Sequence, residues 1–259
     1  MQALVTGASS GIGLEYARQL ARDYQCDLIL VSNQEAELKQ VASEIASQYS
    51  VKTVDHYADL SLNNAAEDLY AWTKEKGYEV DILINNAGVF FFNPYVETSM
   101  KRIDLMLLLH VVTVAKLTRL FAEDMCARKS GYILNMSSMS AWMVMPGIQT
   151  YNATKAFIYN LSKSLWYELK PYNVHITVMA PGAVDTGLFG LAPKLRKLAV
   201  NLTVSIPPQK LVKKALKAMF KGKKAYTPGF INWLSTPILK HTPDWLIFLA
   251  MKFVGKYQK

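Results

Sequence analysis

The chain has 259 residues, of which 51% are hydrophobic and 19% are charged. This length and balance exclude a disordered chain and a small disulfide-stapled scaffold, because the apolar surface is large enough for a full core and only two cysteines are present. The net charge of +9 belongs to the C-terminal part, since the residues from Leu188 onward carry 14 Lys or Arg against one acid, Asp244.

A short apolar run, Ala3 to Val5, leads into a glycine-rich loop with the sequence TGASSGIG and then into a helical pattern through Tyr24. A strand, a glycine loop and a helix in this order predict a phosphate site, because the helix N-terminus offers N–H donors and positive potential. The glycines permit a tight turn, close approach of a pyrophosphate and close helix packing. We expect a nucleotide to lie across Gly7, Ser9, Ser10, Gly11, Ile12 and Gly13.

The second strand, predicted for 27–31, is followed by the residues that should meet the adenosine ribose of a dinucleotide. An acidic residue there favours NAD by binding the ribose 2′-hydroxyl, whereas an arginine accommodates the 2′-phosphate of NADP. The chain has Ser32, Asn33 and Gln34 at these positions. No carboxylate repels a phosphate and two side chains can donate hydrogen bonds to it, so the sequence favours NADP and leaves NAD open.

The middle of the chain alternates apolar strand patterns with amphipathic helical ones. Helices are expected at 35–50, 62–76 and 99–128, and strands at 51–57 and 81–84. The second strand of this group runs into Asn85-Asn86-Ala87-Gly88. Residues 103–114 of the long helix are apolar almost all round, which predicts burial on both sides.

A third group of polar residues follows the strand predicted for 131–136. Ser138 lies at the end of this strand, and Tyr151 and Lys155 are four residues apart on one face of the next helical pattern. Two other Tyr-x-x-x-Lys pairs exist, Tyr70/Lys74 and Tyr159/Lys163, but neither has a serine at a strand end 13 residues earlier. A phenol near a cation can serve as a proton donor to a carbonyl, since the cation stabilises the phenolate. A buried Ser, an interfacial Tyr and a solvated Lys remain the alternative.

Together the motifs TGASSGIG, NNAG and Ser-Tyr-x-x-x-Lys resemble those of the short-chain dehydrogenase/reductase family, and the resemblance extends to about residue 190. It implies that Ser138 orients a substrate oxygen, that Tyr151 donates the proton, and that Lys155 binds the nicotinamide ribose and lowers the Tyr pKa. The implied cofactor contacts also include Ser32, Asn33, Asp59, Leu60, Asn85, Ala87, Gly88, Pro181, Gly182 and Thr186. For Asp59, N-capping of the following helix is the alternative.

One position departs from the family pattern. His110 stands where the family usually has a catalytic Asn that holds a water in a proton relay from the Lys. Imidazole can donate or accept a hydrogen bond and could still position a water, yet it differs in size and titrates near pH 6.5. His110 is therefore a catalytic candidate, with a purely hydrogen-bonded helix residue as the alternative.

A sixth strand is expected at 174–179, closed by Ala180-Pro181-Gly182. Strands that alternate with helices at this spacing predict an α/β fold: a doubly wound parallel sheet of about seven strands, with helices on both faces and ligands at the carboxyl strand ends. We expect one domain over 1–259, in which 188–259 forms a substrate lid and a basic, apolar extension. The family habit of pairing the long helix and the Tyr151 helix across a dimer interface implies a homodimer or homotetramer.

Three interpretations of the basic extension stay open. With its lysines and tryptophans it could lie on an anionic membrane, steer an anionic substrate such as acyl-CoA, or pack on a neighbouring subunit. Its longest apolar run, Trp245 to Met251, is too short to span a bilayer. No zinc spacing or nucleic-acid motif is present, so no metal and no nucleic acid are expected. The absence of a signal-like segment and the cysteine usage favour a cytoplasmic location, with peripheral membrane contact as an option.

The combined reading is an NADP(H)-linked carbonyl reductase or alcohol dehydrogenase. The stretch LILVSNQEAELKQVASEI and the basic tail are similar to the branch with long-chain 3-ketoacyl and 17β-hydroxysteroid reductases, which implies an apolar, lipid-like ketone. The rival hypothesis is a nucleotide-binding regulator or membrane-associated scaffold that keeps the fold without turnover. Only the His110 replacement supports the rival.

Overall fold

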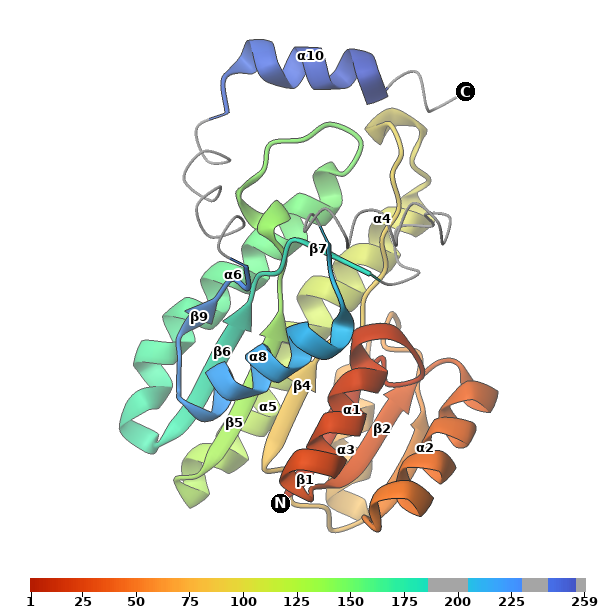
Figure 1. Cartoon of the computed structure of the whole chain (residues 1–259), viewed down its shortest axis with the longest axis vertical. Helices are drawn as coiled ribbons and strands as arrows, with labels where there is room; N and C mark the ends of the chain where they lie inside the picture. The colour runs from red at the N-terminus through yellow and green to blue at the C-terminus, as the bar shows by residue number, and fades with distance from the viewer. Residues whose placement is uncertain (186–204, 230–241, 255–259) are drawn as a thin grey trace.

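A single parallel sheet of seven strands organises the molecule (Figure 1). The computed structural model describes residues 1–185, 205–229 and 242–254, the last range without the side chains of 250 and 252–254. The strands are β1 Gln2–Thr6, β2 Asp27–Ser32, β3 Thr53–Tyr57, β4 Ile82–Asn85, β5 Gly131–Met136, β6 Val174–Met179 and β9 Ala225–Tyr226, in the order β3-β2-β1-β4-β5-β6-β9. A second, two-stranded sheet pairs β7 Ala183–Val184 with β8 Ser205–Ile206. The predicted doubly wound α/β fold is confirmed.

Helices cover both faces of the sheet (Figure 1). One layer consists of α1 Gly11–Tyr24, α2 Glu35–Tyr49 and α8 Pro208–Phe220, and the other of α3 Ala65–Glu75, α5 Thr113–Arg128 and α6 Gln149–Leu169. α4 Met100–Leu107 continues into α5 through the π-helical turn η2 Leu108–Val112, and α10 Asp244–Val254 lies near the C-terminus. Short 3-10 turns occur at η1 Tyr95–Glu97, η3 Met139–Trp142 and η4 Lys170–Tyr172.

The two-residue period of the strands divides the core into two parts. Ala3 and Val5 of β1 face the layer of α1, α2 and α8, whereas Leu4 between them faces α3 and α5. The other long strands alternate in the same way. Because each side is apolar, the sheet is buried on both faces, as parallel sheets require.

The long helix predicted for 99–128 spans Met100–Arg128, but the π-helical turn interrupts its regular hydrogen bonding. By length and composition alone this stretch could cross a membrane, and half of its most apolar window is buried inside the protein. It packs on α3 and α6, which explains much of its apolar character as core packing. The expectation of burial on both sides is only partly met, since Leu107 is exposed.

The helix predicted to begin at Leu62 begins later in the structure, and the predicted substrate lid falls in part outside the described residues. The helix expected from Leu62 begins at Ala65, because Asp59 Oδ1 accepts hydrogen bonds from the amide (3.0 Å) and hydroxyl (2.6 Å) of Ser61 and closes a separate turn. Capping of that helix by Asp59 is therefore wrong, since its N-cap position is Asn64. The first part of the segment expected to form the substrate lid, 188–204, lies outside the described residues.

Candidate functional site

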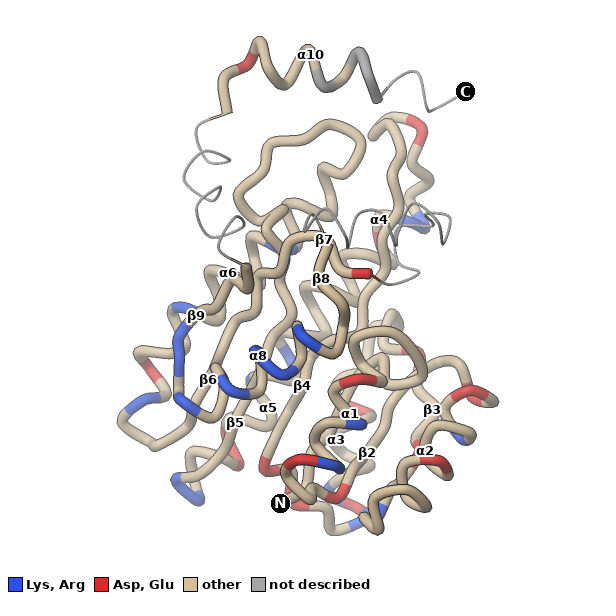
Figure 2. Tube along the Cα trace, in the orientation of Figure 1, with Lys and Arg blue, Asp and Glu red and all other residues tan. Residues whose placement is uncertain are grey.

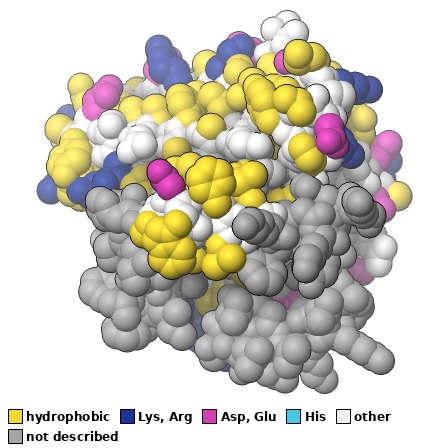
Figure 3. Space-filling model, turned by 90° about the horizontal axis from the view of Figure 1, so that it is seen from above, with side chains coloured by type: hydrophobic (Ala, Val, Ile, Leu, Met, Phe, Trp, Pro, Cys, Tyr) yellow, Lys and Arg dark blue, Asp and Glu magenta, His cyan; other side chains and the backbone are white. Residues whose placement is uncertain are grey.

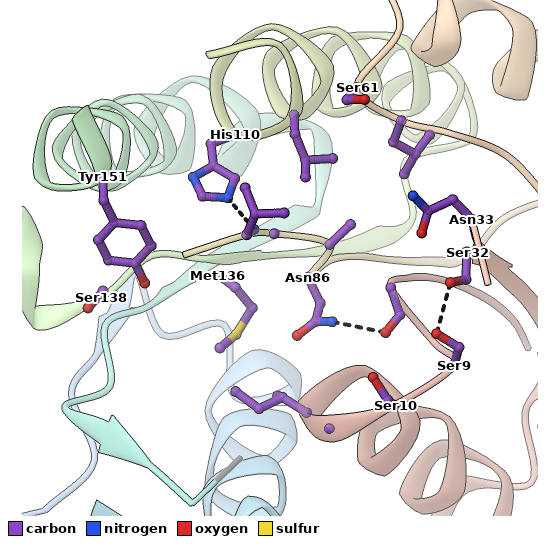
Figure 4. Close-up of a pocket in the computed structure, with 18 of the residues that line it drawn as sticks. Ser9, Ser10, Ser32, Asn33, Ser61, Asn86, His110, Met136, Ser138 and Tyr151 are labelled. Atoms are coloured by element: carbon purple, nitrogen blue, oxygen red, sulfur yellow. Dashed lines mark hydrogen bonds between the residues drawn. The ribbon is translucent and has the colours of Figure 1, made fainter. Parts of the chain in front are cut away.

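A cavity of about 590 Å³ opens at the carboxyl ends of the strands, where β1 and β4 are neighbours (Figure 4). This is the point at which the strand order reverses, and open α/β sheets bind their ligands there. The volume is in the range of a small-molecule site. The lining includes Gly7, Ser9, Ser10, Gly11, Ile12, Ser32, Asn33, Gln34, Asp59, Leu60, Asn86, Ala87, Gly88, His110, Ser137, Ser138, Tyr151, Lys155, Pro181 and Gly182.

The glycine loop after β1 is held close to the β4 end and to its own helix. Gly7 adopts a left-handed φ of 67°, and a Cβ there would lie 2.9 Å from the Cα of Ala87. A Cβ on Gly13 would lie 2.0 Å from the carbonyl oxygen of Gly7, so only glycine fits at this crossing. Gly13 does not line the cavity; it serves the packing role expected of it. The N-cap residue Ser10 makes no side-chain cap, which leaves the first N–H groups of α1 available to a ligand.

Thr6 and Asn86 lock the ends of β1 and β4 together. The Thr6 hydroxyl accepts hydrogen bonds from the amides of Asn86 (2.9 Å) and Ala87 (3.0 Å) and donates to the carbonyl of Ile84. Asn86 Nδ2 donates to the carbonyl oxygen of Thr6 at 3.0 Å. These bonds fix the floor of the cavity. The role of Thr6 was missed in the sequence, where a threonine before a glycine carries no signal of its own.

Serine hydroxyls and an amide lie at the end of β2. Ser9 Oγ and Ser32 Oγ are 2.8 Å apart and share a hydrogen bond (Figure 4). The backbone amide of Gln34 donates a hydrogen bond to Ser32 Oγ. The side chain of Asn33 also lines this part of the cavity. Asp59 is the one carboxylate among the described lining residues, and it is engaged with Ser61.

Ser138, Tyr151 and Lys155 meet at the opposite end of the same cavity. Ser138 leaves β5 in an extended conformation as the N-cap of η3, and its hydroxyl shares a hydrogen bond with the Tyr151 phenol. The Lys155 ammonium lies 5.5 Å from the centre of the Tyr151 ring and donates to the carbonyl of Met136 at 3.0 Å. The edge-to-face contact of Phe90 with Tyr151, at 5.1 Å, helps to shield the phenol from water.

Burial is the largest cause of the pKa shifts of Tyr151 and Lys155. It raises the pKa of Tyr151 to about 12, against a smaller lowering by the Ser138 hydrogen bond. It lowers the pKa of Lys155 to about 7, since no carboxylate offsets the desolvation of the ammonium. The expected lowering of the Tyr pKa by the lysine is therefore wrong for the cofactor-free protein. Both groups are protonated at slightly acidic pH.

The two other Tyr-x-x-x-Lys pairs lie away from the cavity. Tyr70 and Lys74 on α3 both bind Asp124 of α5, each at 3.1 Å. Lys163 lies over the Tyr159 ring on α6, two turns beyond the trio. Neither pair lines the cavity, as the missing serine indicated.

His110 forms part of a buried hydrogen-bond chain. Its Nε2 accepts from the amide of Val89 at 3.0 Å (Figure 4), which places the ring proton on Nδ1, 3.1 Å from the hydroxyl of Thr154. That hydroxyl in turn donates to the carbonyl oxygen of Tyr151 at 2.8 Å. Burial and the Lys155 charge hold the His110 pKa well below its usual value. The neutral ring has both nitrogens engaged, so none is left to hold a relay water, and His110 links the β4 loop to the Tyr151 helix.

Replacing His110 with Leu should lower the free energy of unfolding by about 2–4 kcal/mol, because the Val89 amide and the Thr154 hydroxyl lose their buried partner. Urea titration measures this loss. His110→Asn, which can still accept from the amide, should recover part of the stability and leave the pH dependence of kcat between pH 6 and 8 unchanged. An inflection near pH 6.5 that His110→Asn removes would instead show that His110 titrates during turnover.

Two residues expected to contact the cofactor, Asn85 and Thr186, are not among the described residues that line the cavity. The Asn85 side chain turns away from it: Nδ2 donates to Asn135 Oδ1 (2.8 Å) and Thr118 Oγ1 (3.2 Å), which ties β4 to β5 and α5. Strand alternation turns this side chain away from the cavity, so Asn85 ties neighbouring strand ends together, as the NNAG signature of the family implies, and is not among the lining residues. Thr186 lies outside the described residues. No cluster of three His, Cys, Asp or Glu able to hold a metal ion occurs in the described ranges.

Comparisons with known proteins agree with this arrangement. The family model "short chain dehydrogenase" matches residues 1–194. The very-long-chain 3-oxoacyl-CoA reductase of Homo sapiens is 31% identical, covering 98% of this chain and 79% of that protein, and the Coccidioides immitis protein of the same name is 37% identical, covering 99% and 71%. A short-chain dehydrogenase from Sphingobium yanoikuyae in complex with NADPH has 28% identity and a TM-score of 0.80 over 88% of each chain. The resemblance to the 3-ketoacyl branch is thus confirmed, and the chain belongs to the short-chain dehydrogenase family of oxidoreductases.

Proposed function

We propose that the chain is an NADP(H)-linked carbonyl reductase or alcohol dehydrogenase that uses Ser138, Tyr151 and Lys155 for catalysis. One observation carries the proposal: the hydrogen-bonded Ser138 hydroxyl and Tyr151 phenol share a cavity with the glycine loop and the uncapped N-terminus of α1. A dinucleotide held by the loop therefore has room to reach the phenol. The experiment is an NADPH oxidation assay with short, acyl and steroid ketones; turnover of at least one class is expected.

The residues of the cavity fit a dinucleotide. Gly7 and Gly13 leave no space for a Cβ, and the α1 N-terminus offers N–H donors to a phosphate. NADP(H), when bound, supplies or accepts the hydride at its nicotinamide ring. The backbone around Ala87, Gly88, Pro181 and Gly182 lines the remaining length of the cavity.

The chain's own residues supply the proton chemistry. In reduction, the Tyr151 phenol donates its proton to the oxygen of the carbonyl, and the Ser138 hydroxyl holds that oxygen beside the phenol. The resulting phenolate is stabilised by the Lys155 ammonium, which the buried site screens from water. In oxidation the phenolate takes the proton back. Because burial raises the pKa of Tyr151 to about 12 in the cofactor-free protein, the phenol is protonated at neutral pH and can act as the proton donor.

The end of β2 favours NADP over NAD. The hydroxyls of Ser9 and Ser32 and the amide of Asn33 can donate to a 2′-phosphate, and no carboxylate stands at positions 32–34. Asn33→Asp should raise the KM for NADPH by about 10- to 100-fold and lower that for NADH, because the new carboxylate repels the phosphate and accepts from the 2′-hydroxyl. Gln48→Glu, at an exposed position near the end of α2 that does not line the cavity, is the control for added charge. Equal KM values for NADPH in wild type and Asn33→Asp would contradict this placement.

For the substrate we propose an apolar, lipid-like ketone, of which a 3-oxoacyl thioester is the leading class. Apolar side chains of Val89, Leu105, Leu109 and Met136 line the cavity. The named relatives are reductases of very-long-chain 3-oxoacyl-CoA. The exposed lysines of α8 (Figure 2) form a basic surface that supports an anionic carrier group such as coenzyme A. Preferential turnover of short polar ketones would count against this class.

We further propose that the protein works as a homodimer or homotetramer through the α4–α5 helix, whose Leu107 side chain is exposed, and α6, whose Phe157 is exposed. A cytoplasmic location is retained as a proposal. The rival function, a regulator without turnover, predicts tight NADPH binding with no oxidation on any ketone.

A further inference from the structure

Helix α10 presents apolar side chains to solvent. Trp245 is 67% exposed and Phe248 is 64% exposed, and Leu246, Leu249 and Met251 are exposed as well. The helix lies beyond the sheet and the two helical layers, above the carboxyl ends of the strands (Figure 1). Soluble monomers rarely expose so many large apolar side chains together. The described residues of the chain leave these side chains largely uncovered.

Two other segments add apolar side chains at the same end of the molecule (Figure 1). Val96 in η1 and Met100, the first residue of α4, are 92% and 76% exposed, and Val144, before α6, is 77% exposed. From above, hydrophobic side chains cover much of the described part of this end (Figure 3). We define the apolar end as α10 with Val96, Met100 and Val144.

The distribution of apolar residues around α10 favours a lipid environment over a protein groove. Successive residues of a helix are 100° apart, so the exposed side chains at 245, 246, 248, 249 and 251 spread over most of its circumference. A protein partner covers one face of a helix, whereas lipid can surround it. The helix has 11 residues, too few to cross a bilayer and suited to the interfacial region of one leaflet.

Charge selects the kind of lipid. Asp244 is the one described charged residue of α10 (Figure 2), while the sequence from 240 to 259 contains four lysines and this single acid. Around Val96 and Met100, Lys101 and Arg102 are balanced by Glu97 and Asp104, so the positive excess comes from the lysines after residue 239. Lysines that flank an apolar, Trp-bearing segment in the sequence favour anionic headgroups, because their positive charge is attracted to the headgroup phosphates.

We propose that the apolar end inserts into the surface of an anionic lipid bilayer and so attaches the protein peripherally to a membrane. Val89, Ser138 and Tyr151 line the cavity. The segment from Val89 leads to Val96 and on to Met100 at the start of α4, and Val144 lies between Ser138 and Tyr151 in the sequence. The membrane surface is thus next to the cavity mouth. If the protein is the reductase proposed above, on which this part of the inference rests, its lipid-like ketone enters the cavity from the bilayer and not from water.

Vesicle flotation tests the attachment. The full chain is mixed with vesicles of phosphatidylcholine, with or without 30 mol% phosphatidylserine as an experimental choice, and the bound fraction gives a partition coefficient. Phe248→Glu should lower that coefficient at least tenfold. The matched control is Tyr172→Glu, because Tyr172 is 48% exposed in η4, which precedes β6 at the opposite end of the sheet. Phosphatidylserine should raise binding of the wild type at least fivefold, and 0.5 M salt should reverse that increase.

The outcomes separate membrane attachment from the alternatives. Failure of the wild type to float, equal flotation of wild type and Phe248→Glu, or equal binding to neutral and anionic vesicles each overturns the proposal. A dimer in sedimentation analysis that Phe248→Glu dissociates, without vesicle binding, would assign the apolar end to a second copy. Oxidation of NADPH with a short soluble ketone, measured without vesicles, should be the same in all three proteins. Absence of NADPH oxidation with every ketone class tested, short, acyl and steroid, would refute the reductase function and leave the flotation result standing.

Discussion

Tyr151→Phe should reduce the kcat for ketone reduction by about 10³-fold or more while the Kd for NADPH changes less than about threefold. The Tyr151 phenol lines the cavity and is hydrogen-bonded to the Ser138 hydroxyl, so it is placed to donate a proton to a bound substrate. The substitution removes one oxygen atom but keeps the aromatic ring and its edge-to-face contact with Phe90. The loss therefore falls on proton transfer and not on folding or cofactor binding. Steady-state kinetics and fluorescence titration with NADPH measure the two quantities.

The chain offers an internal control for this substitution. Tyr159 lies on the same helix with a lysine four residues later, and its ring contacts Trp142 outside the cavity. Tyr159→Phe should leave kcat within about twofold of wild type. If Tyr151→Phe turned over as fast as Tyr159→Phe, the proton donor would have to be sought elsewhere.

Lys155→Met should abolish turnover and yet stabilise the cofactor-free protein by about 3–4 kcal/mol at pH 6. Burial lowers the Lys155 pKa from 10.5 to about 7, which corresponds to a cost of up to about 4–5 kcal/mol for keeping the ammonium charged in the folded protein. The hydrogen bond to the carbonyl of Met136 offsets about 1 kcal/mol of this cost, and methionine loses that bond. The buried ammonium is thus kept for function at the expense of stability.

The gain from Lys155→Met should depend on pH. Below about pH 7 the lysine is protonated in both folded and unfolded wild type, so the full penalty is present. Between pH 7 and about 10.5 the unfolded chain binds one proton more than the folded protein, so wild-type stability rises with pH and the advantage of the variant shrinks. Urea titrations at pH 6 and 9 measure the difference. Lys163→Met on the same helix should show no such pH-dependent gain, and a stability loss in Lys155→Met at pH 6 would contradict the account.

Local patterns in the sequence account for most of the fold and the outline of the site. β5 and β6 have the predicted bounds because each is a continuous apolar run closed by polar residues. The glycine loop was predictable because a strand, glycines and a helix follow one another within a short stretch. Ser138, Tyr151 and Lys155 could be singled out because a helix face and a strand end place them together.

Features that depend on distant contacts could not be predicted. The seventh strand, β9, has two residues and shows no alternation, so its pairing with β6 is determined by tertiary packing. Asn85 and Asn86 are adjacent, yet alternation turns only Asn86 toward the cavity. The hydrogen bonds of His110, in the π-helical turn, to the Val89 amide and the Thr154 hydroxyl join residues that are distant in the sequence, and its lowered pKa comes from burial and the Lys155 charge. The sequence suggests a lowered pKa for Tyr151 from the nearby Lys155 charge, but burial, which the sequence does not reveal, raises that pKa.

The transfer of deuterium from NADPH labelled at C4 of the nicotinamide to a long-chain 3-oxoacyl thioester tests the central claim most directly. The reduced product, analysed by mass spectrometry, should gain one deuterium with the wild type when the transferred hydrogen is the labelled one, and Tyr151→Phe should give almost no product. Unlabelled product, or no product from any ketone despite tight NADPH binding, would contradict the claim that this cavity catalyses hydride transfer.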